Sequence, residues 1–268
     1  MFPTLKDLFG WGLPIDTHSA FVALALGLAG VVFLVESRRR GVTDPRIPYL
    51  VLGALAGAAV FSRLGTWAQH LDPSKNLSLF EQLAFGHASM LSALVGAWLG
   101  VHVAKRIVKY GPRTGDLFAP AVALALAVGR FGCLFTEIPG TPTGSDWGIV
   151  LDADAAAYTG APAGVPLHPS FVYEIVFHLV AFAALWFWLR HRPIAAGELL
   201  TLYVAAYGVF RFSVEFVRGN EVAWMGLTRP QLFLIVTIPL LLARIAYQAA
   251  RGRLVVPAER MATHGQTA

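Results

Sequence analysis

The sequence predicts an all-α integral membrane protein with seven transmembrane helices. Of its 268 residues, 56% are hydrophobic and only 14% are charged, and the mean hydropathy is +0.60. A soluble domain of this length would be far more polar. Long apolar stretches and a biased distribution of Lys and Arg add to this indication. We therefore expect one polytopic membrane domain over residues 1–254.

Seven stretches are apolar over the roughly 20 residues that a membrane span requires. They are residues 19–36, 48–66, 87–104, 116–134, 170–189, 198–217 and 230–249.

The Lys and Arg residues predict the orientation of these spans. Fourteen of the 21 lie in the loops 37–47, 105–115 and 190–197 and in the tail 244–268, whereas six lie on the opposite side and Arg211 lies within a span. Positive residues favour the cytoplasmic side, so we expect the N-terminus outside and the C-terminus in the cytoplasm. The formal net charge of +5 reflects these loops and predicts no nucleic-acid partner.

Three further segments are more polar than the spans. Residues 70–86 are too polar to cross the bilayer and are typical of an interfacial segment. Residues 137–168 form a Gly- and Pro-rich loop expected at the outer face, and residues 255–268 form a polar cytoplasmic tail. With a single cysteine, Cys133, the chain can form no internal disulfide and no multi-thiolate metal site.

The sixth span carries ionisable residues on one helical face. In YGVFRFSVEFVR, Tyr207, Arg211, Glu215 and Arg218 are separated by four, four and three residues. One interpretation is an internal ion pair between Arg211 and Glu215 that joins helices. The other is a binding face, because ionisable groups within a membrane cost about 2.5–3.5 kcal/mol each and are commonly functional.

Two more arginines, Arg63 and Arg130, fall at span ends on the same predicted side, and Glu137 follows Arg130 closely. Each arginine alone could extend its head group to the interface. Together with Arg211 and Arg218, they would supply four guanidiniums, which bind phosphate well. The predicted ligand is an anionic headgroup, most plausibly of a phospholipid reached from the bilayer.

The segment PLHPSFVYE before the fifth span contains His168, and there Ser170 or His168 could cap a helix that begins near Pro169. His178 is expected to be either packed in the protein or at the membrane interface. Cys133 is interpreted as a small buried side chain. The alternative is a nucleophilic role, which would require a neighbouring base.

These motifs resemble those of the prolipoprotein diacylglyceryl transferase family, in the family's order and over most of the chain. HPSFVYE is similar to HPSQLYE, and YGVFRFSVEFVR is similar to YGxxRxxxEFxR. The remaining matches are SRLG (62–65), Gly86 with Ser89, GRFG (129–132), WG (147–148) and GLTRPQ (226–231).

The resemblance implies a multi-pass enzyme of the bacterial plasma (inner) membrane. Such an enzyme moves the diacylglyceryl group of phosphatidylglycerol to the lipobox cysteine of a lipoprotein precursor's signal peptide, without a metal or organic cofactor. It implies catalytic roles for Arg130, Tyr207 and Arg211, and the candidate bases are His87, His18 and His168. It implies substrate-binding roles for Arg63, Glu137, His168, Glu215 and Arg218.

Three departures from the family pattern fall near the predicted site. Cys133 replaces an asparagine, His18 replaces a tyrosine, and Leu91-Ser92-Ala93 replaces a His-Gly-Gly element. His87 lies four residues before Leu91, about one helical turn away, and could substitute for the lost imidazole. Two alternatives therefore stay open: a phospholipid-binding relative without catalysis or with another acceptor, and an acyltransferase that uses Cys133.

Overall fold

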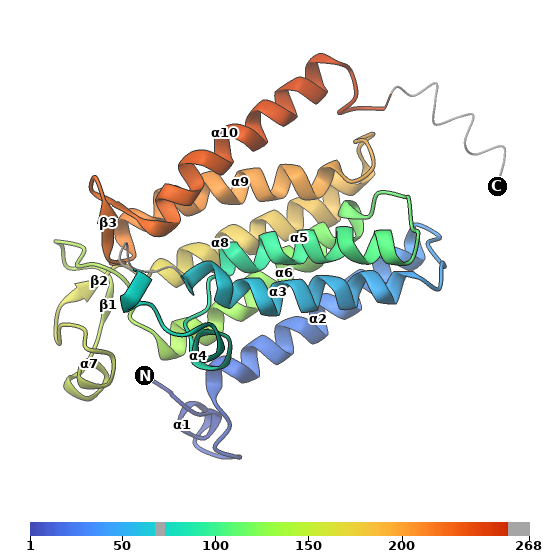
Figure 1. Cartoon of the computed structure of the whole chain (residues 1–268). Helices are drawn as coiled ribbons and strands as arrows, with labels where there is room; N and C mark the ends of the chain where they lie inside the picture. The colour runs from blue at the N-terminus through green and yellow to red at the C-terminus, as the bar shows by residue number, and fades with distance from the viewer. Residues whose placement is uncertain (68–72, 257–268) are drawn as a thin grey trace. The chain divides into compact units, whose positions relative to one another are not determined.

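The computed structural model describes residues 1–67 and 73–256, and it is mostly helical. Seven helical segments are long and apolar enough to cross a membrane, which confirms the predicted all-α membrane fold (Figure 1). The segments are α2 (Thr17–Arg39), α3 (Ile47–Trp67), α5 (Met90–Ile107), α6 (Gly115–Thr136), α8 with its continuation (Ser170–His191), α9 with its continuation (Glu198–Val217) and α10 (Arg229–Ala250).

The third span begins three residues later than predicted. Ser89 caps α5 by accepting a hydrogen bond from the Ser92 backbone N–H, so the helix starts at Met90. Ser, unlike an apolar residue, satisfies one of the exposed N–H groups of a first turn. His87 consequently precedes the helix and is exposed.

The fifth span changes helix type along its length. The α-helical part of α8 is Ser170–Ala183, followed by a π-helical turn η2 (Ala184–Trp188) and a 3₁₀ turn η3 (Leu189–His191). The expected cap was wrong: neither Ser170 nor His168 caps α8. The Ser170 hydroxyl instead donates to the Pro139 carbonyl, which ties the start of α8 to the preceding loop.

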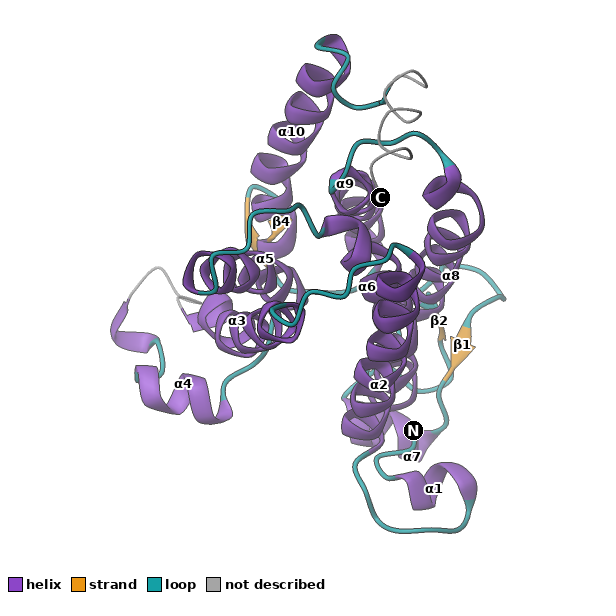
Figure 2. Cartoon of the chain, turned by 90° about the vertical axis from the view of Figure 1, so that its right-hand side faces the viewer, coloured by secondary structure: helices purple, strands orange, loops and turns teal. Residues whose placement is uncertain are grey.

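The first of two compact units comprises Met1–Arg39 and Arg113–Ala268. Within it α6 packs against α2, α8 and α9, and α9 packs against α10. Half of the α6 span is buried, the highest share among the seven. Figure 2 shows α2 running along α6. The core of this unit includes Ala119, Ala123, Leu185, Leu199 and Tyr203.

The second unit, Arg40–Pro112, is built on α3 and α5. The helices meet at two small-xxx-small pairs, Gly53 with Gly57 and Gly96 with Gly100. A Cβ at Gly57 would lie only 2.0 Å from the Gly96 carbonyl oxygen, and one at Gly100 only 1.9 Å from that of Gly53. Such glycines allow the close backbone contact that drives helix association in lipid.

The predicted interfacial segment contains η1 (Pro73–Lys75) and α4 (Leu79–Phe85), while residues 70–72 lie outside the described part of the chain. Ser78 and Glu81 form a capping box for α4. Phe80 and Phe85 are mostly exposed, at 78% and 84%. The interfacial location of residues 70–86 stays a prediction.

The loop 137–168 holds a two-stranded antiparallel sheet and a short helix. β1 (Ile149–Val150) pairs with β2 (Pro166–Leu167), and α7 is Ala153–Thr159. At Gly140 a Cβ would lie 2.4 Å from the Val217 carbonyl oxygen, so only glycine allows the loop to reach the end of the sixth span. The Thr141 N–H donates to that same carbonyl.

The remaining elements lie near the N-terminus and directly before α10. The turn before α10 is a second antiparallel pair, and α10 starts with a capping box of Thr228 and Gln231. The elements are α1 (Leu5–Phe9), β3 (Val222–Trp224) and β4 (Leu227–Thr228). The orientation of the termini and the single domain 1–254 stay predictions, and of the predicted tail, residues 257–268 lie outside the described residues.

Candidate active site

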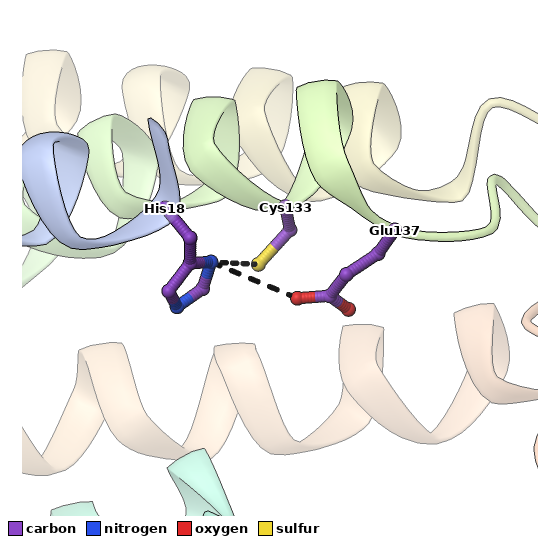
Figure 3. Close-up of side chains that lie close together, drawn as sticks. All are labelled: His18, Cys133 and Glu137. Carbon is purple, nitrogen blue, oxygen red and sulfur yellow. Dashed lines mark hydrogen bonds and ion pairs between the residues drawn. The ribbon is translucent and has the colours of Figure 1, made fainter. Parts of the chain in front are cut away.

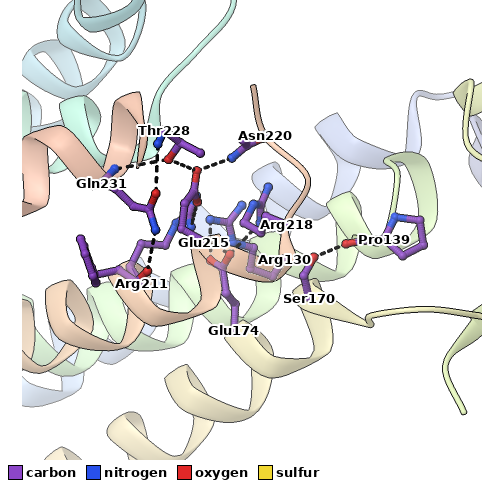
Figure 4. Close-up of polar contacts among 11 residues, drawn as sticks. Arg130, Pro139, Ser170, Glu174, Arg211, Glu215, Arg218, Asn220, Thr228 and Gln231 are labelled. Carbon is purple, nitrogen blue, oxygen red and sulfur yellow. Dashed lines mark hydrogen bonds and ion pairs between the residues drawn. The ribbon is translucent and has the colours of Figure 1, made fainter. Parts of the chain in front are cut away.

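Three arginines from two helices surround one carboxylate, Glu174, in the first turns of α8 (Figure 4). Arg130 Nη2 lies 2.6 Å from Glu174 Oε2, and Arg218 Nη1 donates to Glu174 Oε1 at 2.7 Å. Arg211 Nε lies 3.9 Å from Oε1. Arg130 comes from the last turns of α6, Arg211 comes from the last turn of α9, and Arg218 follows the 3₁₀ turn that continues α9. We call Arg130, Glu174, Arg211, Glu215 and Arg218 the arginine cluster.

Glu215 holds the second carboxylate of the arginine cluster. Its Oε2 forms the ion pair with Arg211 that the i, i+4 spacing predicts. Its Oε1 accepts hydrogen bonds from Asn220 Nδ2 at 2.7 Å and from the Thr228 hydroxyl at 2.8 Å. The backbone tightens into a 3₁₀ turn, η4 (Glu215–Val217), at this residue. Glu215 is therefore fixed from the side opposite to Arg211.

The arginine cluster is buried and carries a net positive charge. Glu174 has no exposed surface, and Arg130 and Arg211 are each 6% exposed. Three guanidiniums and two carboxylates leave one formal positive charge. Two buried guanidinium N–H groups, the Nε of Arg130 and of Arg218, have no hydrogen-bond partner among the described residues. Buried N–H groups usually have an acceptor, so the arginine cluster can bind an additional anionic oxygen.

Arg218 lies just beyond the sixth span, with its side chain 12% exposed. Burial lowers the pKa of its guanidinium, because the charged form loses water, and Glu174 opposes this shift. The guanidinium also lies over the Phe171 ring, 4.6 Å from its centroid. Both contacts hold Arg218 in place as a charged group.

A buried aromatic layer lies beside the arginine cluster. Tyr207 is 1% exposed and lies against Arg130. The His178 ring is 4.6 Å from the Tyr207 ring, and its Nδ1 forms a 2.9 Å hydrogen bond with the Tyr203 hydroxyl. His178 is fully buried, so of its two expected locations the packed one is confirmed.

A second polar group adjoins Arg130 through Cys133. Arg130 Nη1 lies 3.7 Å from Cys133 Sγ, which lies 3.8 Å from His18 Nδ1, and Glu137 Oε1 also lies 3.8 Å from that nitrogen (Figure 3). We call His18, Cys133 and Glu137 the thiol cluster. Cys133 is 4% exposed, as expected for a buried thiol. The predicted residues His18 and Glu137 thus lie close to each other, and Cys133 connects them to Arg130.

Three other predicted residues have local contacts of their own. His168 hydrogen-bonds the Tyr173 hydroxyl at 3.2 Å and meets the Trp147 ring edge-on. Arg63 donates to the Leu83 and Ala84 carbonyl oxygens within the second unit. His87 belongs to that unit too. As site residues, Arg63 and His87 stay predictions.

Glu174 is the central residue that sequence reasoning passed over. It stands in HPSFVYE, the segment that carries the family resemblance, and follows Tyr173. The available signal is a carboxylate four residues after the start of a predicted span. The same protein has several intramembrane arginines that such a carboxylate could pair with. The sequence contains no signal that marks Asn220 or Thr228 as site residues, since each is a common turn or capping residue.

Known proteins of one family are similar to this chain in sequence. The sequence profile described as "Prolipoprotein diacylglyceryl transferase" matches residues 6–247. A phosphatidylglycerol–prolipoprotein diacylglyceryl transferase of Chromohalobacter salexigens is 32% identical over 266 residues, covering 92% of this chain and 93% of that protein. A second such enzyme of Clostridium perfringens is 27% identical over 241 residues, covering 87% and 90%. The chain belongs to the prolipoprotein diacylglyceryl transferase family.

Proposed function

We propose that this protein transfers the diacylglyceryl group of phosphatidylglycerol to the cysteine thiol of a lipoprotein precursor. The observation that carries the proposal is the single net positive charge of the arginine cluster, with two N–H groups that have no partner in the described part of the chain. The phosphodiester of phosphatidylglycerol carries one negative charge and offers acceptor oxygens. Guanidinium groups suit such oxygens in geometry and charge.

The reaction follows from this charge distribution. The acceptor thiol loses its proton, its sulfur forms a bond to the terminal glyceryl carbon, and the bond from that carbon to the phosphate oxygen breaks. Glycerol phosphate leaves with a second negative charge. Arginines held by Glu174 and Glu215 would stabilise this charge as it develops, which is the largest catalytic contribution in many enzymes. Tyr207 would support Arg130.

Among the candidate bases, His18 is supported by its contacts toward the arginine cluster. Its Nδ1 contacts Cys133 Sγ, and that sulfur contacts Arg130. We assign the proton of the incoming thiol to His18, since the thiolate is the reactive nucleophile. Cys133 is then a neighbour and supplies no nucleophile. His168, Glu137 and Arg63 are proposed to contact the substrates.

An apolar groove lies between α8 and α9, and two of its lining residues directly precede members of the arginine cluster in the sequence. It has a volume of about 790 Å³ and is lined by residues that include Tyr173, Phe177 and Phe210. Tyr173 precedes Glu174, and Phe210 precedes Arg211. An acyl chain would fit there, because apolar pockets of about 300–1,000 Å³ are typical of ligand sites.

The remaining setting follows from the predicted topology. With the N-terminus outside, the ends of α6 and α9 that bear the arginine cluster face the outer side of the bacterial plasma membrane. The lipobox cysteine of a precursor's signal peptide would reach the site there, after the precursor enters the bilayer.

The test is a transfer assay with protein purified in phosphatidylglycerol-containing bilayer discs and a lipobox peptide. We expect a thioether-linked diacylglyceryl product and released glycerol phosphate. Arg130→Lys and Arg211→Lys should lower the rate by about 100-fold or more, as for removal of one oxyanion donor. Arg229→Lys, at an exposed arginine, should change it by less than about twofold, as is usual for a surface substitution. No product from folded, lipid-bound protein would refute the proposal.

A further inference from the structure

The thiol cluster brings three metal-ligating atoms to one point. His18 Nδ1, Cys133 Sγ and a Glu137 carboxylate oxygen all lie within 4.8 Å of one another. Figure 3 shows the three side chains pointing toward the same space, His18 from α2 and the other two from the end of α6. Two family departures, His18 and Cys133, supply two of the three atoms.

The direction of the contacts separates a cation site from a catalytic triad. In a triad the base uses one ring nitrogen for the nucleophile and the other for the orienting carboxylate. Here Cys133 Sγ and Glu137 Oε1 both lie 3.8 Å from the same nitrogen, Nδ1. One nitrogen cannot accept a proton from the thiol and donate one to the carboxylate at the same time. The Cys133 thiol also contacts the Glu137 carboxylate, and a cation between the three atoms would replace these proton-mediated contacts.

The distances suit a tetrahedral zinc-type ion after a small closure. Zinc lies about 2.3 Å from sulfur and about 2.0–2.2 Å from nitrogen or oxygen, so its ligand atoms are roughly 3.4–3.6 Å apart. The two observed separations from Nδ1 are 3.8 Å. All three ligand atoms lie within 4.8 Å of one another. The side chains of His18 and Glu137 are 43% and 44% exposed, so they can rotate to bring these separations into the range that zinc requires.

The backbone positions these ligands before any ion binds. Cys133 and Glu137 are four residues apart, and the Glu137 N–H donates to the Cys133 carbonyl at the end of α6. Gly132 lets α2 approach, since a Cβ there would lie 3.1 Å from His18 Cα. The Ser19 N–H donates to the Asp16 carboxylate at 2.6 Å, which fixes the first turn of α2.

We propose that His18, Cys133 and Glu137 form a binding site for a zinc-class divalent cation, with water in the fourth position. A thiolate and an imidazole select such ions over magnesium or calcium. Binding forms the metal–sulfur bond and releases the thiol proton to solvent. Thiolate and carboxylate then neutralise the two positive charges, and Arg130 Nη1, 3.7 Å from Sγ, favours the thiolate.

The site also bears on the proposed function, because the ligand and the proposed base are the same imidazole. A cation on His18 Nδ1 would prevent that histidine from accepting a proton. This consequence rests on the proposed function, whereas cation binding itself does not. Binding is therefore measured without phosphatidylglycerol or peptide.

The test is a Co²⁺ titration of the full chain, purified in detergent without a polyhistidine tag and stripped of metal. We expect one Co²⁺ per chain, a thiolate-to-cobalt charge-transfer band, release of one proton and displacement by Zn²⁺. Cys133→Ser, His18→Gln and Glu137→Gln should each weaken binding by about 100-fold or more, since even outer-shell changes cost about 10–100-fold. His191→Gln and Glu221→Gln, at exposed positions, are the matched controls and should bind as the unchanged protein does.

Two results would overturn the proposal. One is the absence of the charge-transfer band in folded protein. The other is cobalt binding that survives Cys133→Ser. If Cys133→Ser fails to fold, Glu137→Gln decides, because Glu137 is exposed at the helix end and its amide cannot replace the charged ligand.

Discussion

The arginine cluster and the thiol cluster share the last turns of α6 but are suited to opposite kinds of ligand. Arg130 and Cys133 are three residues apart on that helix, and their side chains are in contact. The arginine cluster is almost fully buried and carries excess positive charge. The thiol cluster is half exposed at two of its three residues and supplies electron-pair donors.

The difference shows how burial decides whether a charged group holds its neighbours in place or can rearrange around a ligand. In the arginine cluster, each carboxylate is held by two or more partners and has little freedom to move. Its carboxylates therefore position arginines. In the thiol cluster, Glu137 and His18 keep exposed surface and weak, long contacts. Such groups can rearrange around an ion.

The largest expected effect compares one carboxylate from each cluster. Glu174→Gln should lower the free energy of unfolding by about 3–5 kcal/mol, because it leaves buried guanidiniums without their counter-charge. Glu137→Gln should change it by less than about 0.5 kcal/mol, as for an exposed side chain. Both are measured by unfolding in SDS titrations, with helix content as the signal. Equal effects of the two substitutions would contradict the assignment of Glu174 as the anchor of the arginine cluster.

A smaller effect is expected from the spacing between α2 and α6. A Cβ at Gly132 would lie 3.1 Å from His18 Cα and 3.2 Å from Phe21 Cβ, whereas one at Gly129 meets nothing within 4 Å. Gly132→Ala should shift His18 away from Cys133 and weaken Co²⁺ binding by roughly tenfold, within the range for changes that orient a ligand. Gly129→Ala, the same substitution one turn earlier, should leave the affinity unchanged. A similar loss in both variants would show that the spacing of α2 from α6 does not set the affinity.

The sequence predicts the spans and one face of the arginine cluster because both depend on local periodicity. Apolar length marks the helices, and the four-residue spacing places Arg211 beside Glu215. Glu174 could not be placed, since its contacts with Arg130 and Arg218 depend on how α6, α8 and α9 pack. The thiol cluster joins residues 115 positions apart, through the close helix approach that Gly132 allows. Capping by Ser170 was wrong because its hydroxyl donates to a loop carbonyl 31 residues away.

The smallest expected effect on transfer separates the two clusters most directly. Cys133→Asn restores the residue that the family pattern has at this position. An asparagine side chain offers no thiolate, so Co²⁺ binding should be lost. The transfer rate should stay within about threefold, or about 0.7 kcal/mol of activation free energy, because the arginines remain held by Glu174 and Glu215. The measurements are the cobalt titration and the peptide transfer assay on the same preparation. A transfer rate that falls by about 100-fold or more, or about 2.7 kcal/mol, would place Cys133 in the catalytic step itself and merge the two clusters into one site.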